Sequence, residues 1–163
     1  MPDGVSRPAG VIYCGGRPLS LVIARHGGER VVLAADEIRV NAGPEDYGRY
    51  LLYWYTARTE AIVRGMLPVW AKLISVRPRS VAVKYAKTRW GSCSSYGRIF
   101  LNSRLAMLTP DAAEYVIVHE LCHLKQMNHG PAFWNEVRNA LPDASERRRS
   151  LRAQENLAVL PGI

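Results

Sequence analysis

The feature that most constrains the fold is an apolar segment, YVIVHELCHL (115–124), which contains two histidines and a glutamate. Thr109-Pro110-Asp111 precedes it and has the residue types of a helix start: a hydroxyl to cap free N–H groups, a ring with helical φ, and an acid near the positive helix end. A helix over this segment would be apolar on most sides, so other elements have to enclose it. The sequence therefore predicts a buried central helix.

His119, Glu120 and His123 form the pattern HExxH, which is typical of zinc hydrolases. Four residues of α-helix advance about 6 Å and return to within about 40° of the same direction, so the two imidazoles can hold one metal ion. Glu120 points about 100° away from His119, where it can face a water molecule at the metal. A catalytic zinc site usually has three protein ligands, so this interpretation requires a third ligand nearby.

His129 is the best candidate for that third ligand. An unbroken helix would place it about 9 Å beyond His123 and on a different face, so the sequence predicts a break between the two. Asn128 is suited to end a helix in the left-handed conformation, and Gly130-Pro131 is suited to begin the next one. The alternative is that the histidines are ordinary core or surface residues. A helix start, an apolar context and a third histidine together favour a metal site, because an uncompensated Glu or His is costly in apolar surroundings.

The first part of the chain predicts a small sheet followed by a long amphipathic helix. Residues 11–42 alternate β-rich runs with glycine turns, the pattern of an antiparallel β-meander. From Tyr47 to Met66, apolar residues recur every three or four positions, which indicates a helix packed on a sheet. Pro68 should end or kink this helix, and residues 69–74 would then form a short second one.

The remainder predicts a strand over residues 80–86 paired with Arg98–Asn102, a helix from Pro131 to about Ala140, and a short helix in the tail. The run Arg147–Arg149 is expected on a solvated face of that last helix. Since no linker or repeat interrupts the chain, we expect one domain over residues 1–163, β-rich over about 1–43 and helical over about 44–163. The predicted fold class is α+β.

Composition and charge limit which cellular compartment and which partners are compatible with the sequence. Twenty-two Lys and Arg against 14 Asp and Glu leave a net charge of +8, which would attract anions such as nucleic acid or acidic protein segments. The three cysteines are an odd number and form no CxxC, so neither a disulfide framework nor a zinc ribbon is indicated. The chain has no apolar run typical of a signal peptide or a membrane span. We therefore expect a cytoplasmic protein with no membrane partner.

Residues 87–134 resemble the YgjP-like metallopeptidase family, also called DUF45, and more distantly the SprT-like and WLM zinc proteases. The landmarks of the resemblance are Arg89–Cys93, Leu101-Asn102, the segment 119–129 and Phe133-Trp134. The resemblance implies a zincin-like fold, in which a small sheet packs on helices around the HExxH helix. It further implies that His119, His123 and His129 bind one Zn²⁺ and that Glu120 is the general base.

The expected reaction is peptide bond hydrolysis. Zinc would lower the pKa of its water to about 7, and Glu120 would accept a proton as that water attacks a carbonyl, then pass it to the leaving amine. The substrate would be a peptide or protein, paired as an added strand near Arg98–Asn102. Two alternatives stay open: a nucleic-acid-associated binding module with structural zinc, and a metal-dependent hydrolase of a non-peptide amide.

Neighbouring residues have structural interpretations. Cys122 is expected to be a small core residue, and Phe133 and Trp134 are expected to pack behind His129. The segment Arg89–Cys93 either lines the cleft or forms a tight hairpin connection. His26 is expected to be a solvated turn residue.

Overall fold

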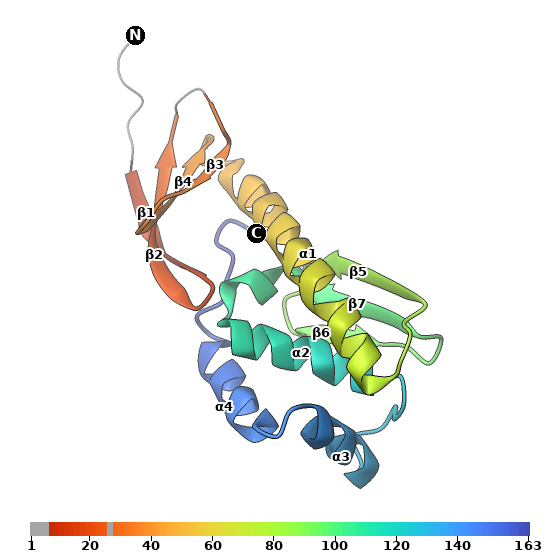
Figure 1. Ribbon diagram of the computed structural model, residues 1–163. Helices are drawn as coiled ribbons and strands as arrows, with labels where there is room; N and C mark the ends of the chain where they lie inside the picture. Colours follow the sequence, from red (N-terminus) through yellow and green to blue (C-terminus); the bar gives the residue numbers. More distant parts are fainter. Residues whose placement is uncertain (1–6, 26–27) are drawn as a thin grey trace.

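The computed structural model describes residues 7–25 and 28–163, which form two small sheets and four α-helices, of which α1 (Tyr47–Ile74) is the longest (Figure 1). The first sheet lies at the N-terminal end of α1, and the second lies beside its C-terminal half. The α+β fold class is confirmed. His26 lies outside the described residues. None of the described helices has the length and apolar character that a membrane crossing requires.

The first sheet has the strand order β1-β2-β4-β3 and is not the meander that the sequence predicts. Its strands are β1 (Arg7–Cys14), β2 (Arg17–Ala24), β3 (Val31–Leu33) and β4 (Glu37–Asn41). The pairs β1–β2 and β3–β4 are antiparallel, but β4 runs parallel to β2. Burial explains the order, because Ile38 and Val40 of β4 are fully buried while two of the three β3 residues are exposed. The more apolar strand therefore takes the central position.

The turn between β1 and β2 joins this sheet to the segment that leads into α2 (Pro110–Cys122). Gly15 and Gly16 have positive φ values of 59° and 79°, which suit the turn of a tight hairpin. Their N–H groups donate to the carbonyls of Ala106 and Met107, each at 2.9 Å. A Cβ on Gly16 would lie 2.3 Å from Cγ2 of Thr109, so only glycine allows this close approach.

Helix α1 continues through Pro68 to Ile74, so of the two effects expected of Pro68 the end of the helix, with a separate short helix over 69–74, is wrong. Its buried residues recur mostly at four-residue steps and face the core: Leu51, Tyr55, Thr59, Val63, Leu67, Ala71 and Ile74. Pro68 is exposed, and so is Arg64. The carbonyl of Arg64 has no helical N–H donor, because Pro68 lacks an N–H group. Water can satisfy that carbonyl. The helix ends at Ser75 in a left-handed conformation, with φ 60° and ψ 48°.

The second sheet has the order β5-β7-β6, with strands β5 (Ser80–Lys84), β6 (Gly91–Cys93) and β7 (Arg98–Asn102). The predicted pairing of residues 80–86 with Arg98–Asn102 is confirmed and is parallel, while β6 pairs antiparallel with β7. Because β7 has a partner on both sides, it offers no free edge to a peptide. The exposed edge near Arg98–Asn102 is therefore that of β6, and the expectation that substrate pairs near Arg98–Asn102 stays a prediction.

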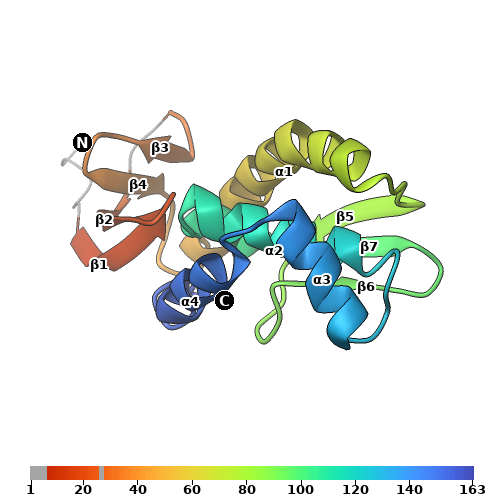
Figure 2. The ribbon, with the colours of Figure 1, turned by 60° about the horizontal axis from the view of Figure 1, so that its bottom comes forward.

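Helix α2 lies at the centre of the second half of the chain, between α1, α4 (Ala144–Gln154), α3 (Pro131–Ala140) and β6 (Figures 1 and 2). Its start is confirmed, with Pro110 in the first turn and Asp111 near the positive end. Thr109 does not cap the helix with its side chain as expected. Its hydroxyl instead accepts a hydrogen bond from Nε2 of Gln154 at 3.0 Å, which ties α4 to the start of α2.

Candidate metal centre and active-site cleft

Three histidine rings meet where α2 ends. Helix α2 stops at Cys122, and His123 is its C-cap. The N–H groups of Leu124 and Lys125 donate to carbonyls three residues back, so the chain leaves the helix in tight turns. It then returns so that Nε2 of His129 lies 3.1 Å from Nε2 of His119. The predicted break is confirmed, and it comes earlier than expected.

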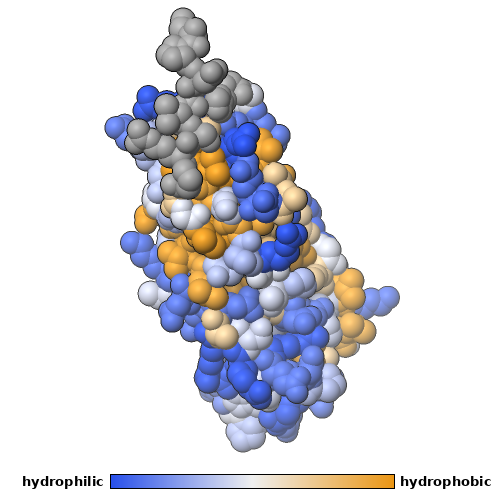
Figure 3. Space-filling view, turned by 90° about the vertical axis from the view of Figure 1, so that its left-hand side faces the viewer, coloured by the Kyte–Doolittle hydropathy of each residue, from blue (hydrophilic) through white to orange (hydrophobic). Residues whose placement is uncertain are grey.

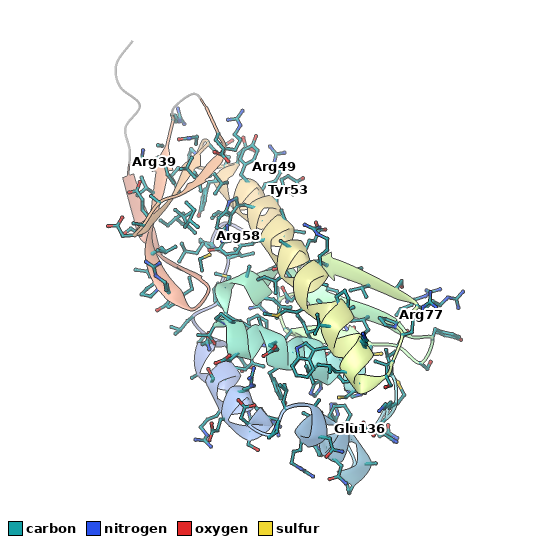
Figure 4. The ribbon with its side chains drawn as sticks, viewed as in Figure 1. Arg39, Arg49, Tyr53, Arg58, Arg77 and Glu136 are labelled. Carbon is teal, nitrogen blue, oxygen red and sulfur yellow. The ribbon has the colours of Figure 1, made fainter. Side chains whose placement is uncertain are left out.

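Asn128 does not end the helix, and the prediction that it adopts a left-handed conformation is wrong. Among the described non-glycine residues, Ser75 alone has a positive φ. The return of the chain is stabilised by side chains instead. Lys125 forms an ion pair of 3.0 Å with Glu136 on α3, which is labelled in Figure 4. Nδ1 of His123 lies 3.0 Å from the carbonyl oxygen of Gln126.

The three rings have the donor set and the spacing of a metal site. One ligand nitrogen from each of His119, His123 and His129 lies within 4.8 Å of the other two. Two nitrogens on one tetrahedral zinc ion, each at about 2.0–2.1 Å, are about 3.3 Å apart. The 3.1 Å between His119 and His129 is close to that value.

The protonation of the rings also suits a cation. Burial, then His123, His129 and Arg148 nearby, lower the pKa of His119 to about 3, and burial lowers the pKa of His123. Both rings are therefore neutral at pH 7 and offer a lone pair. Nδ1 of His119 is buried without a hydrogen-bond partner among the described residues. Nε2 of His119 is therefore the nitrogen placed to bind an ion, since it faces Nε2 of His129.

Aromatic rings of α3 enclose the histidines from behind, as predicted. Phe133 is fully buried and stacks on His123 with ring centroids 4.4 Å apart. Trp134 stacks on His129 at 5.7 Å. Helix α3 begins at Pro131 as predicted, so these two side chains follow His129 by a single turn. Cys122 is fully buried, consistent with its expected place in the core.

Glu120 lies in the cleft next to the three histidines. Its side chain is buried, and burial raises its pKa to about 7. It lines a cleft of about 290 Å³ together with His119 and the β6 segment. It is not among the three residues whose ligand atoms converge. A carboxylate in this position is available for proton transfer.

The segment Arg89–Cys93 both lines the cleft and forms a strand. Trp90 and Gly91 face the cleft, and Gly91 begins β6. A Cβ on Gly91 would lie 2.8 Å from Cγ and Oε1 of Glu120, so the backbone of β6 closely approaches this carboxylate. The expectation named Arg89, Ser92 and Cys93 as lining residues, whereas the residues of this segment that line the cleft are Trp90 and Gly91.

Two buried polar residues hold this segment in place. Nδ2 of Asn102 donates to the carbonyls of Ala86 and Arg89 at 2.7 and 2.6 Å. Arg104 donates to the carbonyl of Lys87 at 3.0 Å, and its guanidinium lies 4.5 Å from the ring centroid of Trp90. The backbone that borders Glu120 is thus fixed by side chains from β7 and from the 3₁₀ helix η1 (Ser103–Met107) that follows it.

The model of the YgjP-like metallopeptidase domain matches residues 5–154 of this chain. The chain belongs to the YgjP-like metallopeptidase family. As a member of the family it is a metal-dependent hydrolase, and the recognition that rested on residues 87–134 is confirmed.

Two solved metallopeptidase zymogens are similar in structure. Abylysin of Pyrococcus abyssi is 27% identical, with a TM-score of 0.51, over 58% of this chain and 94% of that one. Jannalysin of Methanocaldococcus jannaschii is 22% identical, with a TM-score of 0.50, over 56% of this chain and 95% of that one, and shows similarity of fold. A comparison with curated proteins gave no significant match.

Sequence reasoning missed three residues of this YgjP-like site. Tyr115, Arg148 and Arg152 all line the cleft beside Glu120. Tyr115 precedes His119 by four residues, so helical spacing alone could have placed it on the same face. Arg148 and Arg152 have the same spacing on α4, but the sequence contains no signal that this helix lies against the cleft.

We predict that Gly91→Ala displaces the Glu120 carboxylate. The added methyl group would require Glu120 to shift, and a misplacement of about 1 Å in a catalytic group can lower a rate by about 10²-fold. Peptide cleavage is therefore expected to fall about 10–100-fold while metal content stays unchanged. Gly65→Ala on α1 is the control, since a Cβ there contacts nothing within 4 Å. Equal cleavage rates in the two variants would contradict the prediction.

Proposed function

We propose that this protein is a zinc peptidase in which His119, His123 and His129 bind one Zn²⁺ and Glu120 is the general base. The proposal rests on the convergence of three imidazole nitrogens within 4.8 Å of one another, beside a cleft that contains a buried carboxylate. Membership of a metallopeptidase family supports it.

The ligand set supports a catalytic site more than a structural one. Structural zinc sites are closed by four protein ligands, whereas catalytic sites have three and keep one position open. Among the described residues, the group of potential ligands consists of the three histidines. Zinc bound there would supply Lewis acidity, which polarises a substrate carbonyl and lowers the pKa of water to about 7.

Glu120 would move the proton in the reaction. One of its carboxylate oxygens accepts a proton from the attacking water and then donates it to the nitrogen of the leaving amine. A general base works best when its pKa is near the working pH, and burial raises the pKa of Glu120 to about 7. The backbone of Gly91 lies close to this carboxylate, because a Cβ at that position would be only 2.8 Å from it.

The substrate would bind as an extended peptide along β6. Among the described strands, β6 pairs with β7 alone, so its other edge has unpaired backbone groups. Gly91 at the start of β6 lies against Glu120, which brings an added strand close to the proposed base. A peptide on this edge would pass the histidine triad.

We also propose that the chain forms one domain and works in the cytoplasm. Matching of residues 5–154 to one domain model supports the first statement. For the second, all three cysteines are free, including Cys14 and Cys93, which are half-buried. Free thiols persist in a reducing compartment.

Metal removal tests the proposal. Purified protein is expected to contain one zinc ion per chain by elemental analysis. Stripping with a chelator should abolish cleavage of a mixed pool of internally quenched peptides, and one equivalent of zinc should restore it. Full cleavage by the metal-free protein would contradict the proposal, and so would a pool that stays intact with zinc bound.

A further inference from the structure

The cleft beside the proposed zinc site has two unlike walls. One wall is the segment that contains Trp90 and Gly91, and the other is α4. Helix α4 contributes Arg148, Leu151 and Arg152 to the cleft. Arg148 and Arg152 are four residues apart, which is about 6 Å along one helix face, so both guanidinium groups project on the same side.

These two arginines have no carboxylate partner among the described residues, unlike the arginine next to them. Arg147 forms ion pairs with Asp111, Glu114 and Asp143 and is bound into the structure. Neither Arg148 nor Arg152 appears in an ion pair or a side-chain hydrogen bond within the described ranges, and both are exposed. The cleft therefore contains two guanidinium groups whose hydrogen-bonding capacity no described residue uses.

Arg148 is the closer of the two to the histidines. Its guanidinium lies 4.9 Å from the ring centroid of Trp134, and Trp134 in turn stacks on His129. Arg148 also separates the cleft from a second hollow of about 250 Å³ between α3 and α4. This end of the molecule is hydrophilic in Figure 3, in the lower part of the view, where Figure 1 places α3 and α4.

Two carboxyl groups line the same cleft, and neither forms an ion pair with Arg148 or Arg152 among the described residues. Glu120 is buried on α2, on the wall that contains His119. Glu155, just past the end of α4, is three residues from Arg152 but seven residues and about 10 Å along the helix from Arg148. The part of the cleft next to Arg148 is thus cationic.

An extended peptide on β6 would direct alternate side chains toward α4. We infer that Arg148, with Arg152, is a specificity determinant that binds a carboxylate of the substrate close to the scissile bond, so the preferred substrate is an acidic peptide. This inference rests on the proposed peptidase function. The carboxylate is that of an Asp or Glu side chain or of a free C-terminus, and both suit the bidentate geometry of a guanidinium.

Peptide binding tests this inference without requiring turnover. The probes are peptides of one sequence scaffold, each with an uncharged dye and an amidated C-terminus. Glu, Gln or Lys is placed in turn at each central position. A second set has a free C-terminus. Affinities are measured by fluorescence anisotropy with zinc-loaded Glu120→Gln protein at about 0.15 M ionic strength, where distant charges are screened.

At one position, Glu is expected to bind about 5–30-fold more tightly than Gln, the range for a charge-assisted hydrogen bond in a partly exposed site. Adding Arg148→Gln should remove this preference, and Arg148→Glu should reverse it in favour of Lys. Arg149→Gln, which removes the same charge from an exposed position on the same helix, should retain it. Reversal by Arg148→Glu is an effect that unfolding cannot produce.

Three results distinguish the inference about Arg148 from its alternatives. Equal affinity for Glu and Gln at every position, with no gain from a free C-terminus, would overturn the inference. So would a preference that survives Arg148→Gln together with Arg152→Gln. Cleavage assays with wild-type protein test the proposed function separately. Selective binding without cleavage would contradict the proposed peptidase activity but would support the inferred carboxylate site.

Discussion

Replacing Glu120 by Gln is expected to lower the rate of peptide cleavage by about 10²–10⁴-fold while the protein keeps its zinc. Gln has nearly the same shape but cannot accept the proton from water, so the cleft and the triad should remain intact. The comparison requires kcat/KM for one quenched peptide, together with zinc content by elemental analysis. Loss of rate with full metal content is the signature of a general base.

The control for this variant is Glu60→Gln on the exposed face of α1. It removes the same charge from a surface position outside the cleft and should leave kcat/KM unchanged. If Glu120→Gln cleaves as fast as the wild type, Glu120 is not the base. If it instead loses zinc, Glu120 supports the metal, and the three-histidine description of the site is incomplete.

Replacing His129 by Ala is expected to weaken zinc binding by more than about 100-fold. Loss of a partner that merely supports a metal ligand costs about 10–100-fold in affinity, and loss of a direct ligand should exceed that. Zinc affinity can be measured by competition with a chromophoric chelator. Because the side chain of His129 is exposed, its removal leaves no cavity in the core, and the fold should survive.

Asn128→Ala provides the matched control, since it alters the preceding residue in the same turn. Asn128 has an ordinary negative φ, so alanine fits there without strain. Zinc affinity close to that of the wild type is expected for this variant. An equal loss in both variants would mean that the turn, and not the imidazole, determines affinity.

The central helix and its break could be predicted because local chemistry determines them. Pro110 and Asp111 specify a helix start, and Pro131 specifies the next one. Between them, His129 could not reach the other two histidines unless the helix ended. The position of the break could not be predicted, because the tight turns after Cys122 and the bond from His123 to the carbonyl of Gln126 depend on contacts absent from the sequence pattern.

Long-range packing determines the features that the sequence did not reveal. The parallel pairing of β2 with β4 follows from the deep burial of Ile38 and Val40. Alternating hydrophobicity in a sequence indicates that one face of a strand is buried, but it does not show that the strand lies in the middle of a sheet. Pro68 is tolerated because it falls on the exposed face of α1. Arg147 and Arg148 are adjacent and look alike in the sequence. Only the docking of α4 on α2 separates a residue bound in ion pairs from one that lines the cleft.

Arg104 gives the cleft one further property. Its guanidinium bonds the carbonyl of Lys87 ahead of β6 and also that of Ala158, beyond α4, at 3.1 Å. A single buried guanidinium group thus links both margins of the cleft and opposes their independent movement. We therefore expect the two margins to move together, so that the width of the cleft stays nearly constant.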